Sequence, residues 1–195
     1  MGALQGFRYF LGVRPDPQRY PLFQRICEAL GLSNRLDLLH LTLCVVAETG
    51  VRDHFVVRRV QRALCGAALH TFPVNLSRIA AGPQGAFART CGRQDEIQDF
   101  YRALVRLLRA CGIEPLHRKS GLHPHVTLGY VACEVALLRI ALRWFPTELL
   151  LIESEVGLTR HNVLHRWLLL PPRQPPLPFE EGFIAAADPA RRSAA

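Results

Sequence analysis

Short apolar runs and amphipathic segments follow one another along this chain and predict an α+β fold. Seven runs of strand length, rich in leucine, β-branched or aromatic residues, are expected to form β-strands. They cover 8–13, 38–46, 70–80, 85–91, 125–131, 148–158 and 163–170. Four segments carry apolar residues at helical spacing and are expected to form helices. They cover 17–30, 53–64, 94–111 and 134–143. The predicted strands at 38–46 and 125–131 are each followed by a predicted helix, which indicates two similar α+β halves.

The apolar patterning predicts where the folded domain ends. We expect residues 1–170 to form a single domain, because 195 residues with 49% hydrophobic composition can bury a full core. From 171 to 195 the sequence is rich in Pro and Ala, and the stretch "PPRQPPLP" offers little to pack. We therefore expect a flexible C-terminal tail.

One short pattern occurs twice, each time inside a predicted strand. The tetrapeptide HLTL begins at His40, and HVTL begins at His125. Because side chains alternate across a strand, Thr42 emerges beside the first histidine, and Thr127 emerges beside the second. Each motif therefore presents an imidazole and a hydroxyl group on one face. The intervening residues, which are expected to face the core, are Leu41, Leu43, Val126 and Leu128.

Two histidines facing one groove suit acid–base chemistry at phosphorus. A neutral imidazole can accept a proton from an attacking water while a protonated imidazole donates one to the departing oxygen. The threonine hydroxyls can donate hydrogen bonds to the non-bridging oxygens. Random placement of the histidines and threonines gives only about 0.3 such triplets in a chain of this length. The alternative is a pair of strand histidines that merely bond to the backbone.

The paired motifs give the chain a recognisable resemblance. Together with the opening "RYFLGV", the Pro in "PHVTL" and the closing "LLLIESEVGL", they resemble the 2H phosphoesterase superfamily over roughly 7–170. Within it, the chain looks like the LigT-like RNA 2',3'-cyclic phosphodiesterases, also called the 2'-5' RNA ligase family. The resemblance implies a bilobal α+β fold with two pseudo-symmetric antiparallel-sheet lobes, outer helices and a central cleft.

The resemblance also implies an activity and the residues that perform it. The expected reaction opens 2',3'-cyclic phosphates of RNA 3' ends or small cyclic nucleotides to 2'-phosphates, with no metal, no cofactor and no obligate protein partner. The catalytic positions fall on His40 and His125, and the phosphate-binding positions fall on Thr42 and Thr127. Many relatives carry an arginine shortly after the second motif, where this chain has Gly and Tyr.

Four further residues are candidates for substrate binding. Arg118 and Lys119 precede the second motif on a predicted loop, Tyr130 follows it, and Arg160 lies in the last predicted turn. His161 lies in the same predicted turn and is weighed together with Arg160, since residues in a turn usually have no further role. A metal site built from the His117, His123 and His125 group is disfavoured, because no acidic or cysteine ligand lies close by in sequence.

Two other functions remain open at this stage. The same cleft could hold an RNA end or a nucleotide without turnover, or act on another cyclic or 2'-5' phosphodiester. ATP-linked RNA joining is disfavoured by the absence of a G-x-x-x-x-G-K-[ST] phosphate loop.

Composition refines this interpretation. The net charge of +8 favours a polyanionic partner, although the skew toward arginine and its even spread leave a basic cleft undecided. The six cysteines form no C-x-x-C pair and are expected to be reduced. With no apolar run near the roughly 20 residues that span a bilayer, and no signal-peptide pattern, we expect a cytoplasmic protein.

Overall fold

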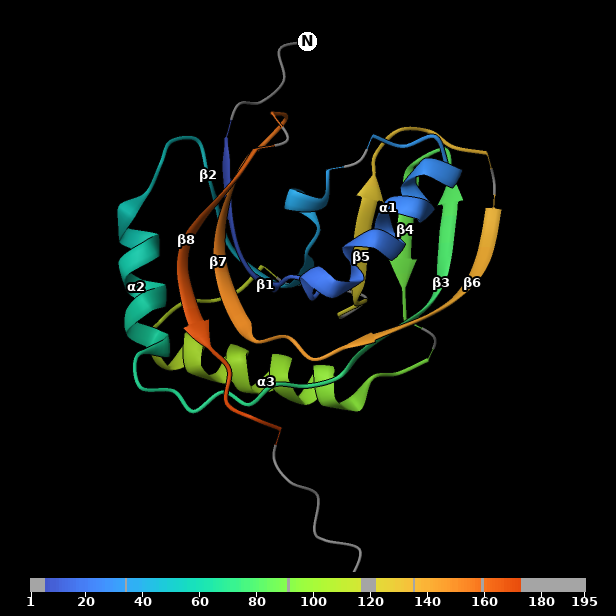
Figure 1. Cartoon of the computed structure of the whole chain (residues 1–195). Coiled ribbons are helices and arrows are strands. Elements are labelled where there is room, and N and C mark those ends of the chain that lie inside the picture. The colour runs from blue at the N-terminus through green and yellow to red at the C-terminus, as the bar shows by residue number, and fades with distance from the viewer. Residues whose placement is uncertain are drawn as a thin grey trace, which may run out of the picture.

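The computed structural model describes residues 6–33, 35–90, 92–116, 122–134, 136–158 and 160–172. These residues form one antiparallel sheet with helices packed against it (Figure 1), which confirms the predicted α+β class. The strands are β1 (Phe7–Val13), β2 (Leu41–Thr49), β3 (Val74–Gly82), β4 (Gly85–Arg89), β5 (His125–Gly129), β6 (Ala136–Trp144), β7 (Glu148–Glu155) and β8 (Arg160–Leu168). The helices are α1 (Tyr20–Ala29), α2 (His54–Leu64) and α3 (Asp95–Ala110), with short 3-10 helices η1 (Pro17–Arg19) and η2 (Leu36–Leu38).

The sheet consists of two four-stranded halves. Its order is β6-β3-β4-β5-β2-β1-β7-β8, so the two motif strands, β5 and β2, lie side by side in the middle. In Figure 1 the half containing β2, β1, β7 and β8 carries α2 on its outer side, and the half containing β5, β4, β3 and β6 lies opposite. In the described residues β2 and β5 pair only at Leu41 and Val126. The two predicted lobes therefore share one sheet with a narrow junction.

Local sequence signals account for the helices in the first half of the chain. The Asp16 carboxylate accepts a hydrogen bond from the Gln18 amide at 2.9 Å, and Gly31 ends the α1 region with a φ of +63°. Asp53 caps α2 by accepting a bond from the Phe55 amide at 2.8 Å. Both helical regions were predicted within a few residues, because caps and apolar spacing agree.

The predicted helix at 134–143 is wrong. This segment forms β6, which pairs antiparallel with β3 along most of its length. Its Leu, Ala and Arg residues have good helix propensity, but the strand supplies hydrogen bonds to the free edge of β3. Leu142 and Trp144 are buried, whereas Ala141, Arg143 and Phe145 are exposed, which is the period of a strand. The second motif strand is consequently followed by another strand, and not by a helix.

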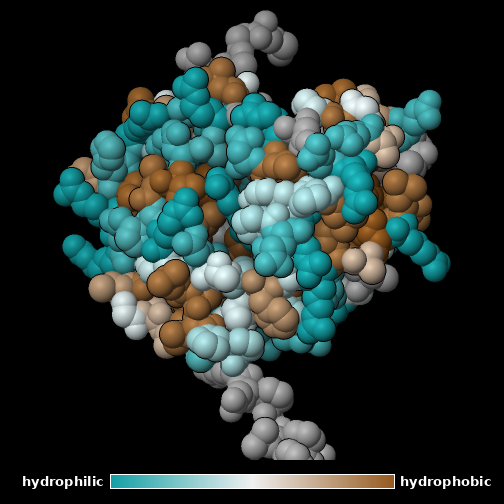
Figure 2. All heavy atoms as spheres, viewed as in Figure 1, coloured by the Kyte–Doolittle hydropathy of each residue, from teal (hydrophilic) through white to brown (hydrophobic). Residues whose placement is uncertain are grey.

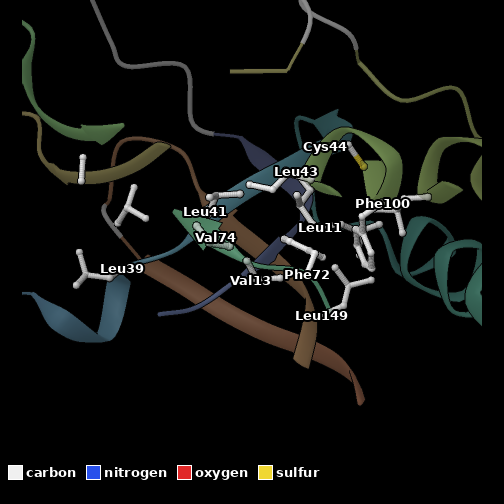
Figure 3. Packing of buried hydrophobic residues seen from close by; sticks show 14 of the residues in the cluster. Leu11, Val13, Leu39, Leu41, Leu43, Cys44, Phe72, Val74, Phe100 and Leu149 are labelled. Atoms are coloured by element: carbon white, nitrogen blue, oxygen red, sulfur yellow. The ribbon is translucent and has the colours of Figure 1, made fainter. Parts of the chain in front are cut away.

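The core lies on the face of the sheet that the motif leucines occupy. Leu41 and Val126 are both 0% exposed, and Leu43 and Leu128 are nearly as buried, as the alternation predicts. Figure 3 shows Leu41 and Leu43 among other buried side chains of the same cluster. The opposite face therefore carries the histidines and threonines.

The surface is mixed in character. On the side seen in Figure 2, hydrophilic residues cover most of the surface, and hydrophobic residues reach it in separate patches. The five described cysteines are free thiols, of which only Cys27 and Cys44 are buried. Within the described residues, every helix is too short or too polar to cross a bilayer.

Candidate active site

The two motif histidines lie at the junction between the halves of the sheet. His40 immediately precedes β2, and His125 is the first residue of β5. The paired residues, Leu41 and Val126, are their direct neighbours in sequence. Since the strands are antiparallel, this pairing relates the two motifs by an approximate two-fold axis. Continuing the register sets Thr127 across from His40 and Thr42 across from His125.

Each imidazole is held by the same backbone interaction. The His40 Nδ1 lies 2.7 Å from the carbonyl oxygen of Leu38, and the His125 Nδ1 lies 2.8 Å from that of His123. A carbonyl oxygen only accepts, so Nδ1 carries the proton in both rings. Proton exchange with a substrate then falls to Nε2. These are the backbone bonds that the non-catalytic alternative predicts, but they orient both rings through Nδ1 and do not use Nε2.

An aromatic ring supports each histidine from the neighbouring strand. Phe10 of β1 lies with its ring centroid 4.8 Å from that of His40, and Phe87 of β4 lies 5.7 Å from His125. The two phenylalanines differ in register, because Phe87 pairs with Thr127 while Phe10 pairs with Val45. Apolar rings next to the imidazoles restrict their motion and lower the local polarity.

A third imidazole lies beside the first. The ring of His161 meets the ring of His40 edge-on, with centroids 4.9 Å apart. The turn assigned to His161 from sequence is wrong, because β8 begins at Arg160 and pairs His161 with Ser154. The strand therefore starts three residues earlier than predicted and brings this side chain to the site.

The surroundings of His40 keep its ring neutral. Burial, which has the largest effect, and the positive charges of His161, Arg14 and His125 together lower the pKa of His40 from 6.5 to about 4. The hydrogen bond to Leu38 opposes this shift only in part. Burial, followed by the charge of Arg14, also lowers the pKa of His161. At neutral pH the His40 imidazole can therefore accept a proton.

Arg14 is a site residue that the sequence reasoning missed. It directly follows β1, and its charge acts on both His40 and His161. Its Nε is buried and has no hydrogen-bond partner among the described residues. A guanidinium with an unused donor is suited to an anionic oxygen. The only signal in the sequence was a basic residue at the end of the first strand.

The remaining candidates divide into two groups. Arg118, Lys119 and His117 lie outside the described residues. Tyr130 is 77% exposed at the end of β5, with its ring centroid 6.3 Å from that of Phe87. Arg160 forms an ion pair with Glu155 at 3.4 Å, so its charge is partly committed. Across the described part of the chain, no three His, Cys, Asp or Glu side chains gather where they could hold a metal ion.

Comparisons with known proteins give structural matches only. No protein-family model and no curated protein sequence matches the chain. A crystal structure of a phosphoesterase matches with a TM-score of 0.66 at 18% identity, covering 83% of this chain and 97% of the other. E. coli LigT complexed with 3'-AMP matches with 0.66 at 17% identity, covering 84% and 98%. TT0787 of Thermus thermophilus matches with 0.62 at 19% identity, covering 83% and 97%. The fold of this chain is therefore that of the LigT-like phosphoesterases.

Proposed function

We propose that this protein hydrolyses 2',3'-cyclic phosphates, at RNA 3' ends or in small nucleotides, to 2'-phosphates by a two-histidine acid–base mechanism. The observation that carries the proposal is the matched pair of imidazoles at the sheet junction, each held through Nδ1 by a carbonyl two residues earlier. A structural neighbour, E. coli LigT, has been crystallised with 3'-AMP, ATP and NADP+, which supports a nucleotide ligand in this fold.

His40 fits the role of the base. Its lowered pKa leaves Nε2 unprotonated, so it can take a proton from the attacking water. A phosphate anion bound nearby raises this pKa toward neutrality, which strengthens the base where the reaction occurs. The water oxygen forms a bond to phosphorus as the phosphorus–O3' bond breaks. His125, protonated, then donates its Nε2 proton to O3', which leaves a 2'-phosphate and a 3'-hydroxyl.

The non-bridging oxygens need donors as their charge increases. Thr42 and Thr127 each follow a motif histidine by two residues and so lie on the same face of the sheet, where their hydroxyls can donate to these oxygens. The orphaned Nε of Arg14 supplies a positive donor beside His40. The proposal therefore assigns proton transfer to two residues and charge stabilisation to three.

The test uses a short oligoribonucleotide that ends in a 2',3'-cyclic phosphate, incubated in EDTA. Wild type should convert the substrate only to the oligonucleotide with a terminal 2'-phosphate. His40→Ala and His125→Ala should each lower kcat by about 10²–10⁴-fold. His165→Ala is the matched control, because that histidine lies in β8 and contacts Gln61 instead of the motif pair. Full activity in both motif variants, or loss of wild-type activity in EDTA, would contradict the proposal. Tight binding without product would favour the binding-module alternative.

A further inference from the structure

A row of arginines crosses the sheet on the face of the catalytic histidines. In the register of the sheet, His125 of β5 pairs with Arg89 of β4, Arg89 with Arg78 of β3, and Arg78 with Arg139 of β6. Residues directly opposite one another on neighbouring strands point to the same face. We call Arg89, Arg78 and Arg139 the arginine ladder. It runs from the second histidine to the outer edge of the sheet, over strands that lie side by side in Figure 1.

Burial of the alternate residues fixes the face. The neighbouring row consists of Val126, Ala88 and Ile79, all 0% exposed in the core. The three ladder arginines are exposed. Their guanidinium groups therefore lie on the solvent face, beside the proposed active site.

The ladder differs from the other half of the sheet in how its charge is balanced. Strands β3, β4, β5 and β6 contain no Asp or Glu, and within the described residues no ladder arginine has a carboxylate partner. In the other half, arginines form ion pairs with acidic residues of the same sheet. These pairs are Arg8 with Glu48, Arg160 with Glu155, and Arg166 with Glu148. The positive charge of the ladder is thus available to an external anion.

The surface on either side of the ladder is hollowed. One hollow of about 320 Å³ is lined by Arg78, Arg89 and Arg93, and it reaches His123 next to the active site. A second hollow, also of about 320 Å³, is lined by the β3–β4 turn with Ala80 and Phe87. The first hollow is basic and the second is largely apolar. A single-stranded nucleic acid, which carries phosphates on one side and bases on the other, matches this combination of a basic hollow and an apolar hollow.

We propose that the arginine ladder binds the backbone phosphates of a single-stranded RNA whose cyclic 3' end lies at His125. The inference rests on the proposed function and specifies its substrate as an oligonucleotide. Strands are about 4.8 Å apart, so Arg139 lies about 14 Å from His125. A mononucleotide has no phosphate at that distance from its reacting end. The bases lie over the second hollow, which Phe87 helps to line, since aromatic side chains stack on unpaired bases.

The experiment compares two substrates in the same variants. The measured quantity is the ratio of kcat/KM for an oligoribonucleotide cyclic phosphate to kcat/KM for a mononucleoside 2',3'-cyclic phosphate. Each phosphate contact on a single strand contributes about 0.7 to the slope of log K against log salt, which is about fivefold at 0.1 M salt. Arg78→Ala and Arg139→Ala should each lower the ratio about fivefold and reduce its salt slope by about 0.7. Arg106→Ala, which removes an exposed charge from α3, is the matched control.

A second measurement separates failure of the ladder from failure of the proposed function. Binding of a fluorescent oligoribonucleotide with a terminal 2'-phosphate is followed by anisotropy at several salt concentrations. If neither substrate is hydrolysed but Arg78→Ala and Arg139→Ala weaken binding with a smaller salt slope, the ladder stands and the proposed function fails. If hydrolysis occurs and the ratio matches that of Arg106→Ala, the ladder is refuted and the function stands. Unchanged binding in folded variants without any hydrolysis refutes both.

Discussion

Protonation of His40 should make the folded protein sensitive to mild acid. An unfolded chain has a histidine pKa near 6.5, whereas burial lowers the pKa of His40 to about 4. Between these values the unfolded state binds a proton that the folded state does not, so the free energy of unfolding falls as the pH is lowered. The difference between the two pKa values corresponds to about 3 kcal/mol in full, of which about 2 kcal/mol is lost between pH 7 and pH 5.

The His40→Asn variant tests this expectation, because the asparagine amide can still donate to the carbonyl of Leu38 but does not titrate. Urea unfolding at pH 7 and pH 5 gives the free energy of unfolding of each protein. Wild type should lose about 2 kcal/mol more than the variant over this interval. His70→Asn sets the baseline, because the His70 Nδ1 also bonds a carbonyl, that of Pro171, at 2.8 Å. An equal loss in wild type and His40→Asn would refute the assignment of a buried, neutral imidazole.

Three further changes test other parts of the site. Thr42→Val or Thr127→Val should lower kcat for steady-state hydrolysis about 10²–10³-fold, because valine has no hydroxyl to donate to the phosphate. Serine at the same position should keep most of the wild-type kcat. Equal rates in the valine and serine variants would argue against this role. Gly12→Ala should destabilise by about 1–3 kcal/mol in urea unfolding, since its Cβ would lie 2.8 Å from the carbonyl of Leu41; wild-type stability would exclude this close approach. Arg14→Met should raise KM at least about tenfold, because it removes a charged hydrogen bond worth about 1.5 kcal/mol or more. It should also move the acidic limb of the pH–rate profile to higher pH, because the charge of Arg14 lowers the pKa of His40. An unmoved limb would show that this charge does not act on His40.

The parts of the fold that could be predicted from sequence are those fixed by local pattern. Apolar residues at helical spacing predicted the first two helical regions, which begin at the caps Asp16 and Asp53, and alternation predicted the burial of Leu41 and Val126. The segment of β6 was misassigned because its composition suits a helix and its pairing with β3 joins residues far apart in sequence. Propensity carries no information about which edge of a sheet is unpaired.

The residues of the candidate site also fall into those that a local sequence pattern predicts and those that strand pairing brings together. His40 and His125 could be found because the motif is short, repeated and local. Arg14 and His161 could not, since each reaches His40 through strand pairing and not through sequence proximity. The arginine ladder could not be predicted from the sequence either, because Arg78 and Arg139 become neighbours only through the pairing of β3 with β6.

The single pair at Leu41 and Val126 has a mechanical consequence. The sheet has a crease there, because β2 and β5 pair at one position while their outer neighbours pair at several. His40 belongs to one half of the sheet, and His125 belongs to the other. A small rotation about the crease changes the separation of the imidazoles while leaving each ring bonded to its own carbonyl. In the proposed mechanism the spacing of the acid and the base would thus depend on the twist of the whole sheet, and substitutions far out on β6 or β8 that alter this twist would alter the rate.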